Sequence, residues 1–199
     1  TGDKAVSLVV TQNECASSST LKTISVREIP TSDFTAPVFV CGTNTGTFEY
    51  SGVKTDKTFT WTWNGGLVQS GTSGGPLLVK WDTLGNKTVS LVTNLNGCQS
   101  AATSRVVSVR EMPTSTFNIP SVICGTNPAT ITYTGSAPSN ATFTWDLKGG
   151  LIQSGSGGGP LQVSWITLGD KTVSLVTTQN ECVSTSTSKV VSVRAVSYT

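Results

Sequence analysis

The sequence predicts an all-β protein made of tandem two-sheet sandwiches, and three observations support this fold class. The segment Leu84–Arg110 recurs 84 residues later and, in a related form, 83 residues earlier, so the chain consists of copies of one unit. Apolar and polar residues alternate with a period of two along most of the chain, as in half-buried strands. Glycine, asparagine and proline interrupt these runs at short intervals, and no window has helical spacing.

The repeat predicts two complete units and a leading fragment. We expect the complete units at residues 29–111 and 112–199, with residues 1–28 forming the C-terminal half of a preceding unit. At each junction the sequence Ser-Val-Arg-Glu-Ile/Met-Pro ends a strand, and the proline restricts the residues around it. A unit of this size can bury one small core. We therefore expect tandem domains with short linkers in an extended row.

The strands of the first complete unit are expected from its alternating runs and the turns between them. β-Branched residues dominate these runs, and Phe59, Trp61 and Trp63 alternate with threonines. In order, the strands are expected at 32–35 with 38–40 (halves of one broken edge strand), 46–51, 57–63, 66–70, 77–82, 87–94 and 103–110, separated by turns at Gly42–Asn44, Asn64–Gly66, Gly74–Pro76, Leu84–Asn86 and Asn96–Gly97. Seven short strands in about 84 residues are the signature of an immunoglobulin-like β-sandwich.

Two pairs of tryptophans recur with the unit. Trp61 and Trp145 share their parity with the phenylalanines two residues earlier, so we expect them to face the core. Trp81 ends the strand expected at 77–82, Trp165 ends its counterpart in the second repeat, and we expect both to be more open. They are the candidates for surface recognition.

The order of these motifs resembles the PKD-like domain. The resemblance rests on FTWTWNGG and FTWDLKGG, then L-x-V-x-W, then T-L-G-x-K-T-V-S-L-V-T, and it covers essentially the whole chain. With the added cysteines in Cys-Gly-Thr-Asn contexts, the sequence is similar to PKD-like and Ig-like repeats of very large secreted surface proteins of Bacteroidetes. Some of these are gliding-motility adhesins exported by the type IX system. The family's acidic Gly-Asp-Gly turn is replaced here by Asn64–Gly66 and Lys148–Gly150, so the resemblance implies no calcium site.

The five cysteines follow the same period. No close pair of the C-x-x-C kind occurs, which argues against zinc. Regular cysteine pairs in a small domain rich in serine and threonine favour disulfides and an extracellular setting over buried free thiols. The favoured pairing is Cys41–Cys98 with Cys124–Cys182, one bridge in each repeat, and Cys15 is then unpaired. A bridge across the junction, Cys41–Cys182, stays open, because in an immunoglobulin topology the two turns of one repeat lie at opposite ends.

Composition argues against several function classes. The net charge of +2 is small and its lysines and arginines are scattered, so no nucleic-acid partner is expected. No apolar run approaches the length of a membrane span. The chain contains no histidine, its acids are spread singly, and the Gly71–Pro76 and Gly155–Pro160 segments lack the Lys-Ser/Thr of a phosphate loop. We therefore expect no enzyme, no catalytic residue, no metal and no cofactor, and we interpret the glycine-rich segments as flexible hairpin connections.

The expected function is that of a stalk segment in a large extracellular repeat adhesin or cell-surface filament, with neighbouring repeats of the same chain as its partners. One alternative is a module that binds glycans or a substratum through Trp81, Trp165 and the glycine-rich hairpins. Another is an accessory domain of a secreted hydrolase.

The leading fragment supplies only two strands, and an isolated hairpin is marginal in water. Upstream residues, a neighbouring chain or the first complete repeat would have to cover its apolar face. We expect the molecule to continue upstream, with strand donation between chains as the alternative. The candidates for this face are Ala5, Leu8, Val10, Ile24 and Val26.

Overall fold

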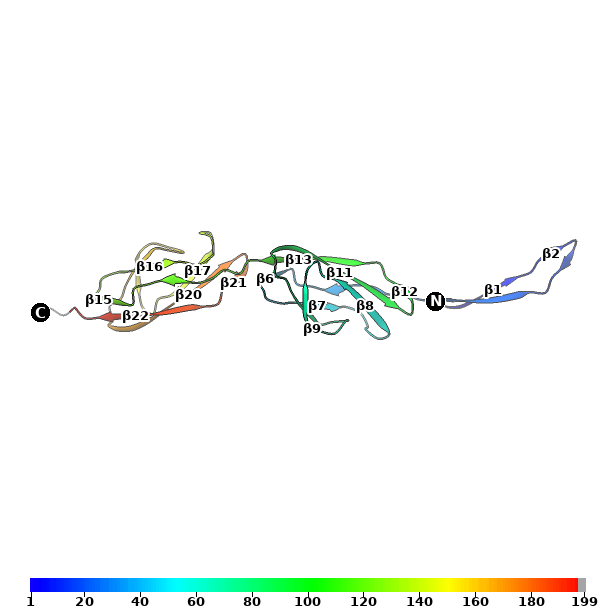
Figure 1. Cartoon of the computed structure of the whole chain (residues 1–199), viewed down its shortest axis with the longest axis horizontal. Coiled ribbons are helices and arrows are strands. Elements are labelled where there is room, and N and C mark those ends of the chain that lie inside the picture. The colour runs from blue at the N-terminus through cyan, green and yellow to red at the C-terminus, as the bar shows by residue number, and fades with distance from the viewer. Residues whose placement is uncertain (197–199) are drawn as a thin grey trace. The chain divides into compact units, whose positions relative to one another are not determined.

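The computed structural model describes residues 1–196, in which all regular elements are strands. The chain divides into two compact units, Thr1–Val109 and Arg110–Thr199, which are described separately. The strands up to the first unit boundary are β1 (Gly2–Leu8), β2 (Thr11–Gln12), β3 (Cys15–Ala16), β4 (Thr20–Val26), β5 (Phe34–Thr35), β6 (Phe39–Cys41), β7 (Gly46–Tyr50), β8 (Lys57–Thr62), β9 (Leu67–Gly71), β10 (Leu77–Lys80), β11 (Gly85–Leu95), β12 (Cys98–Gln99) and β13 (Thr103–Arg110) (Figure 1).

The first repeat is a sandwich of two sheets. One sheet has the order β5-β7-β10-β9, and the other has the order β12-β11-β13-β6, with β8 also paired to β11. The edge strand is broken as expected, since its first half, β5, joins one sheet and its second half, β6, joins the other. This switch gives the edge strand contacts with both layers of the sandwich.

The second repeat has the same two-sheet topology. Its sheets have the orders β14-β16-β19-β18 and β15-β22-β20-β17, and β21 pairs with β20. The half-strand β15 runs parallel to β22, while the other pairings of this repeat are antiparallel. Its strands are β14 (Phe117–Asn118), β15 (Val122–Cys124), β16 (Ala129–Tyr133), β17 (Thr142–Asp146), β18 (Leu151–Ser154), β19 (Leu161–Ser164), β20 (Gly169–Gln179), β21 (Cys182–Val183) and β22 (Thr187–Arg194).

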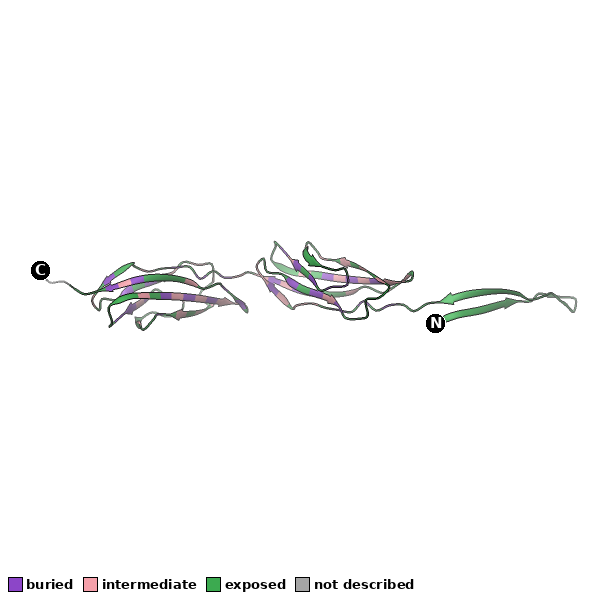
Figure 2. Ribbon diagram, turned by 90° about the horizontal axis from the view of Figure 1, so that it is seen from below, coloured by how far each residue is buried: buried purple, intermediate pink, exposed green. Residues whose placement is uncertain are grey.

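Each repeat has its own hydrophobic core between its sheets. Buried residues alternate with exposed ones along the core strands, and the same alternation occurs in both sandwiches (Figure 2). The all-β, immunoglobulin-like sandwich expected from the sequence is confirmed. The first core contains Phe34, Val40, Phe48, Tyr50, Leu77, Val79, Trp81, Val89, Leu91, Val107 and Val109, and the second contains Phe117, Ile123, Ala129, Ile131, Leu147, Leu161, Val163, Trp165, Val173, Leu175, Val191 and Val193.

The hairpin that begins with β11 is longer than expected. Strand β11 extends to Leu95, and the short strand β12 continues the ladder after a two-residue turn. Both turn residues, Asn96 and Gly97, have positive φ angles of 50° and 86°. An Asn-Gly pair adopts this conformation at low cost, and its twist matches the flanking strands, which is why the ladder continues through the turn.

The leading hairpin, formed by β1 and β4, has the same pairing register as β11 and β13. Unlike those strands, it has no second sheet of the described residues packed on its apolar face. Gly2 pairs with Val26 just as Gly85 pairs with Val109. Val6 and Leu8 are 52% and 64% exposed, although their counterparts Val89 and Leu91 are fully buried. The core-type face of this hairpin contains Val6 in place of Ala5, because Ala5 has the parity of the exposed Thr88. The other four residues expected on this face have the correct parity.

Candidate functional site

The two tryptophans proposed for surface recognition are buried, which corrects that expectation. Trp81 and Trp165 are each 1% exposed. Their indole nitrogens donate to Trp63 O at 2.9 Å and to Leu147 O at 2.8 Å. The reason is parity, since Leu77, Val79 and Trp81 alternate inward along β10 and its extension.

A glycine covers each of these buried rings. A Cβ atom built on Gly66 would lie 2.8 Å from Trp81 Cε2, and one built on Gly150 would lie 2.8 Å from Trp165 Cε2. These distances are shorter than van der Waals contact. The Gly-Gly pair after the third strand therefore lets the backbone pass directly over the tryptophan, so neither ring is available to a ligand.

Trp61 and Trp145 pack against the cores, as expected, and also reach the surface. Their rings meet Phe34 and Phe117 edge-on, with centroids 5.0 Å apart in each pair. Trp61 Nε1 donates to Ser73 O at 2.7 Å, and Trp145 Nε1 donates to Gly157 O at 3.0 Å. These tryptophans hold the glycine-rich hairpins, Gly71–Pro76 and Gly155–Pro160, against the sheet that contains β8 or β17.

Further backbone bonds hold the glycine-rich hairpins on their other side. Tyr50 N donates to Gly74 O at 3.1 Å, and Tyr133 N donates to Gly158 O at 3.2 Å. Each hairpin also closes internally, through Gly75 N to Thr72 O at 2.7 Å in the first repeat. The hairpins thus bridge the two sheets at one end of each sandwich, which the interpretation as simple flexible connections did not foresee.

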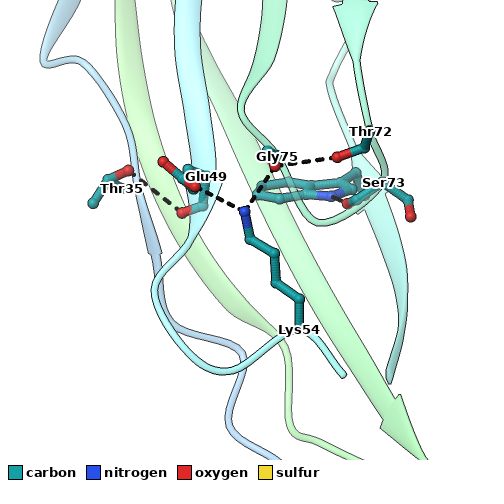
Figure 3. A network of polar contacts seen from close by, with 7 residues as sticks. Thr35, Glu49, Lys54, Thr72, Ser73 and Gly75 are labelled. Atoms are coloured by element: carbon teal, nitrogen blue, oxygen red, sulfur yellow. Dashed lines mark hydrogen bonds and ion pairs between the residues drawn. The ribbon is translucent and has the colours of Figure 1, made fainter. Parts of the chain in front are cut away.

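In the first repeat a lysine fills the space beside this hairpin (Figure 3). Lys54 Nζ donates to Gly75 O and to Glu49 Oε1, both at 2.8 Å. Thr72 Oγ1 donates to the same Gly75 carbonyl at 3.1 Å. A Cβ atom on Gly74 would meet both the Lys54 stem and the Phe59 ring at 3.1 Å, so the stem and the ring lie on the same side of the hairpin.

In the second repeat the same space is open. Ala137 stands in the position of Lys54, and Thr132 stands in that of Glu49. A hollow of about 400 Å³ results, lined by Thr132, Tyr133, Ala137, Ser139, Phe143 and the hairpin residues 156–159. The lining contains aromatic, hydroxyl and backbone groups and no charged side chain.

The turn after the third strand of the second repeat carries an ion pair where the PKD-like pattern has an acidic turn. Lys148 Nζ lies 2.5 Å from Asp146 Oδ2. The hydrogen bonds from the Lys148 side chain and backbone lower the pKa of Asp146. Within residues 1–196, no three metal-ligating side chains cluster, and no helix could span a membrane.

The cysteines differ from the favoured pairing. Cys41 and Cys182 are disulfide-bonded, whereas Cys15, Cys98 and Cys124 are free thiols. The bridges Cys41–Cys98 and Cys124–Cys182 are therefore not formed. The two bonded cysteines are those of the alternative pairing that the sequence left open, Cys41–Cys182.

The topology explains why cysteines of one repeat do not pair. In the second repeat Cys124 lies beside Arg194, next to the Gly169 end of β20, while Cys182 pairs with Gln179 at the other end. The eleven residues of this strand span about 30 Å, and a disulfide needs Cα atoms less than about 7 Å apart.

No family model matches the sequence, and no curated protein matches it. Among solved structures, the chain is similar to Drosophila OTK extracellular domains 3–5, with 8% identity and a TM-score of 0.48 over 90% of this chain and 67% of that one. It is similar to the N-terminal eight Ig domains of the cell adhesion molecule DSCAM, with 16% identity and a TM-score of 0.44 over 95% of this chain and 28% of that one. The fibronectin(III)-like modules of Clostridium thermocellum CbhA match with 19% identity and a TM-score of 0.37, over 82% and 95%. Sequence identities and TM-scores this low carry no argument about function.

Proposed function

We propose that the chain is a non-enzymatic structural segment of an extracellular tandem-repeat protein. The observation that carries this proposal is a contact that occurs once in each unit. Arg27, which ends the leading hairpin, donates to Asn96 O, and Arg110, which ends the next repeat, donates to Asn180 O at 2.8 Å and pairs with Glu181. In both cases the last arginine of one copy binds the turn before the Asn-x-Cys cysteine of the next copy. A contact that recurs with the repeat is what an array built from one unit requires.

The proposal includes a covalent bond that accompanies this contact, joining Cys41 to Cys182. Cys124 lies beside Arg194, the last arginine of its repeat, and Gly125 N donates to Arg194 O at 2.8 Å. Cys41 is the counterpart of Cys124 in the first repeat, and the Arg110 side chain binds the two residues just before Cys182.

The setting proposed is the surface of a bacterial cell, in a large secreted protein of the Bacteroidetes gliding-motility type exported by the type IX system. The resemblance to PKD-like repeats supports this origin, and the disulfide supports an oxidising, extracellular compartment. Neighbouring repeats would be the main partners, and the repeated row would act as a stalk.

Small-angle scattering of the oxidised chain tests the stalk. Repeats joined by short linkers and a disulfide should give a maximum dimension close to the summed lengths of the repeats, with little change on dilution. A compact particle with the sandwiches side by side would contradict the proposal.

A second candidate function, glycan or surface binding, is favoured by one observation only. The second repeat has an open, uncharged hollow where the first has a lysine.

A further inference from the structure

The two repeats differ in how far the glycine-rich hairpin and the tyrosine beside it are buried. In the first repeat Gly74 and Gly75 are buried and Tyr50 is 3% exposed. In the second repeat Gly159 is exposed and Tyr133 is only half-buried. The difference in burial is explained by one side chain. Lys54 covers the hairpin in the first repeat, and the second repeat has the smaller Ala137 at that position.

The lysine shows what the hollow can accept. Its methylene stem lies on the side of the hairpin that carries the Phe59 ring, and its ammonium group donates to a backbone carbonyl. The space beside each hairpin thus combines an apolar wall with a hydrogen-bond acceptor. In the second repeat the corresponding wall is formed by Tyr133 and Phe143, whose ring centroids are 4.8 Å apart, and the corresponding acceptor is Gly159 O.

The charge of the hollow selects among occupants. In the first repeat the Glu49 carboxylate compensates the lysine ammonium at 2.8 Å. Thr132 replaces this carboxylate in the second repeat, so an ammonium group there would lose water without gaining a counter-ion. Hydroxyl groups of Thr132, Ser139 and Ser156 border the hollow instead. A ligand with an apolar C–H face and several neutral hydroxyl groups matches all of these features.

We propose that the hollow of the second repeat binds one neutral pyranose unit of a glycan. The C–H face of the sugar packs against Tyr133 and Phe143, and its hydroxyl groups donate to Gly159 O and exchange hydrogen bonds with the surrounding side-chain hydroxyls. The first repeat carries its own lysine in this place and does not bind. The proposal goes beyond the structural role, and either can fail without the other.

The test uses the whole chain and neutral methyl pyranosides (gluco, galacto and manno) at millimolar concentrations, followed by NMR chemical shifts. At least one sugar should shift signals of residues around Tyr133 and Phe143, and none should shift those around Tyr50 and Phe59. No shift with any of the three sugars, or equal shifts in both repeats, would overturn the proposal. Stronger binding of methyl glucuronide would also overturn it, because the hollow would then select charge.

Two double variants provide matched controls taken from the chain itself. Thr132→Glu with Ala137→Lys installs the pair of the first repeat, and it should weaken sugar binding at least tenfold. Glu49→Thr with Lys54→Ala opens the first repeat, and it should add shifts around Tyr50. Thermal unfolding of each variant verifies that its repeat is folded. Unchanged binding in the closed variant would place the sugar elsewhere and contradict the assignment.

Discussion

Replacement of Trp81 by alanine is expected to destabilise the first repeat by about 3–5 kcal/mol. The ring is 1% exposed and meets Phe48 at a centroid distance of 5.9 Å. The substitution leaves a cavity, and it removes the donor to Trp63 O. Small domains have total stabilities of about 5–15 kcal/mol, so the first repeat should lose much of its own.

The second repeat supplies the control for this variant. Calorimetry of the Trp81→Ala chain should show an early transition for the first repeat and a nearly unchanged one for the second. Trp165→Ala should give the reverse pattern. If Trp81 were a surface platform, its removal would shift neither transition by more than a few tenths of a kcal/mol, and that result would refute its position in the core.

Replacement of Cys41 by serine should produce the second large effect. A bond from Cys41 to Cys182 closes a long loop, and in the chain-entropy model such a bond stabilises the folded state by about 4–5 kcal/mol. The Cys41→Ser chain should therefore unfold at clearly lower denaturant concentration under oxidising conditions, and added reductant should not lower its midpoint further.

Cys98→Ser and Cys124→Ser are the matched controls. Both residues are free thiols, and Cys124 is exposed. Their replacement should change the midpoint little, and each of these chains should still respond to reductant. A loss of stability in Cys98→Ser equal to that in Cys41→Ser would contradict the assignment of the bond.

The strands could be predicted from the sequence because their signal is local. Alternating runs such as Val89 to Thr93 report which residues face the core, and the structure places them there. The burial of Trp81 could also have been predicted from the sequence, since its parity matches that of Leu77 and Val79. We expected it to be open because it ends its strand, and the covering glycine, Gly66, comes from a different part of the chain.

The hollow and the cysteine states depend on contacts between distant segments, so the sequence alone did not reveal them. The difference between Lys54 and Ala137 is visible when the repeats are compared. Its meaning requires the position of Gly75, whose carbonyl accepts a hydrogen bond from Lys54, 21 residues earlier in the chain. For the cysteines, the expected immunoglobulin topology already placed the two turns of one repeat at opposite ends, but their regular spacing favoured a bridge within each repeat, and the sequence left both pairings open.

Peptide mapping of the native chain without reductant tests the central claim, the covalent link between successive repeats, most directly. Digestion after alkylation of free thiols should yield one cross-linked peptide pair that joins Cys41 to Cys182, with Cys15, Cys98 and Cys124 alkylated. A pair that joins Cys41 to Cys98, or Cys124 to Cys182, would contradict the claim and restore one bridge within each repeat.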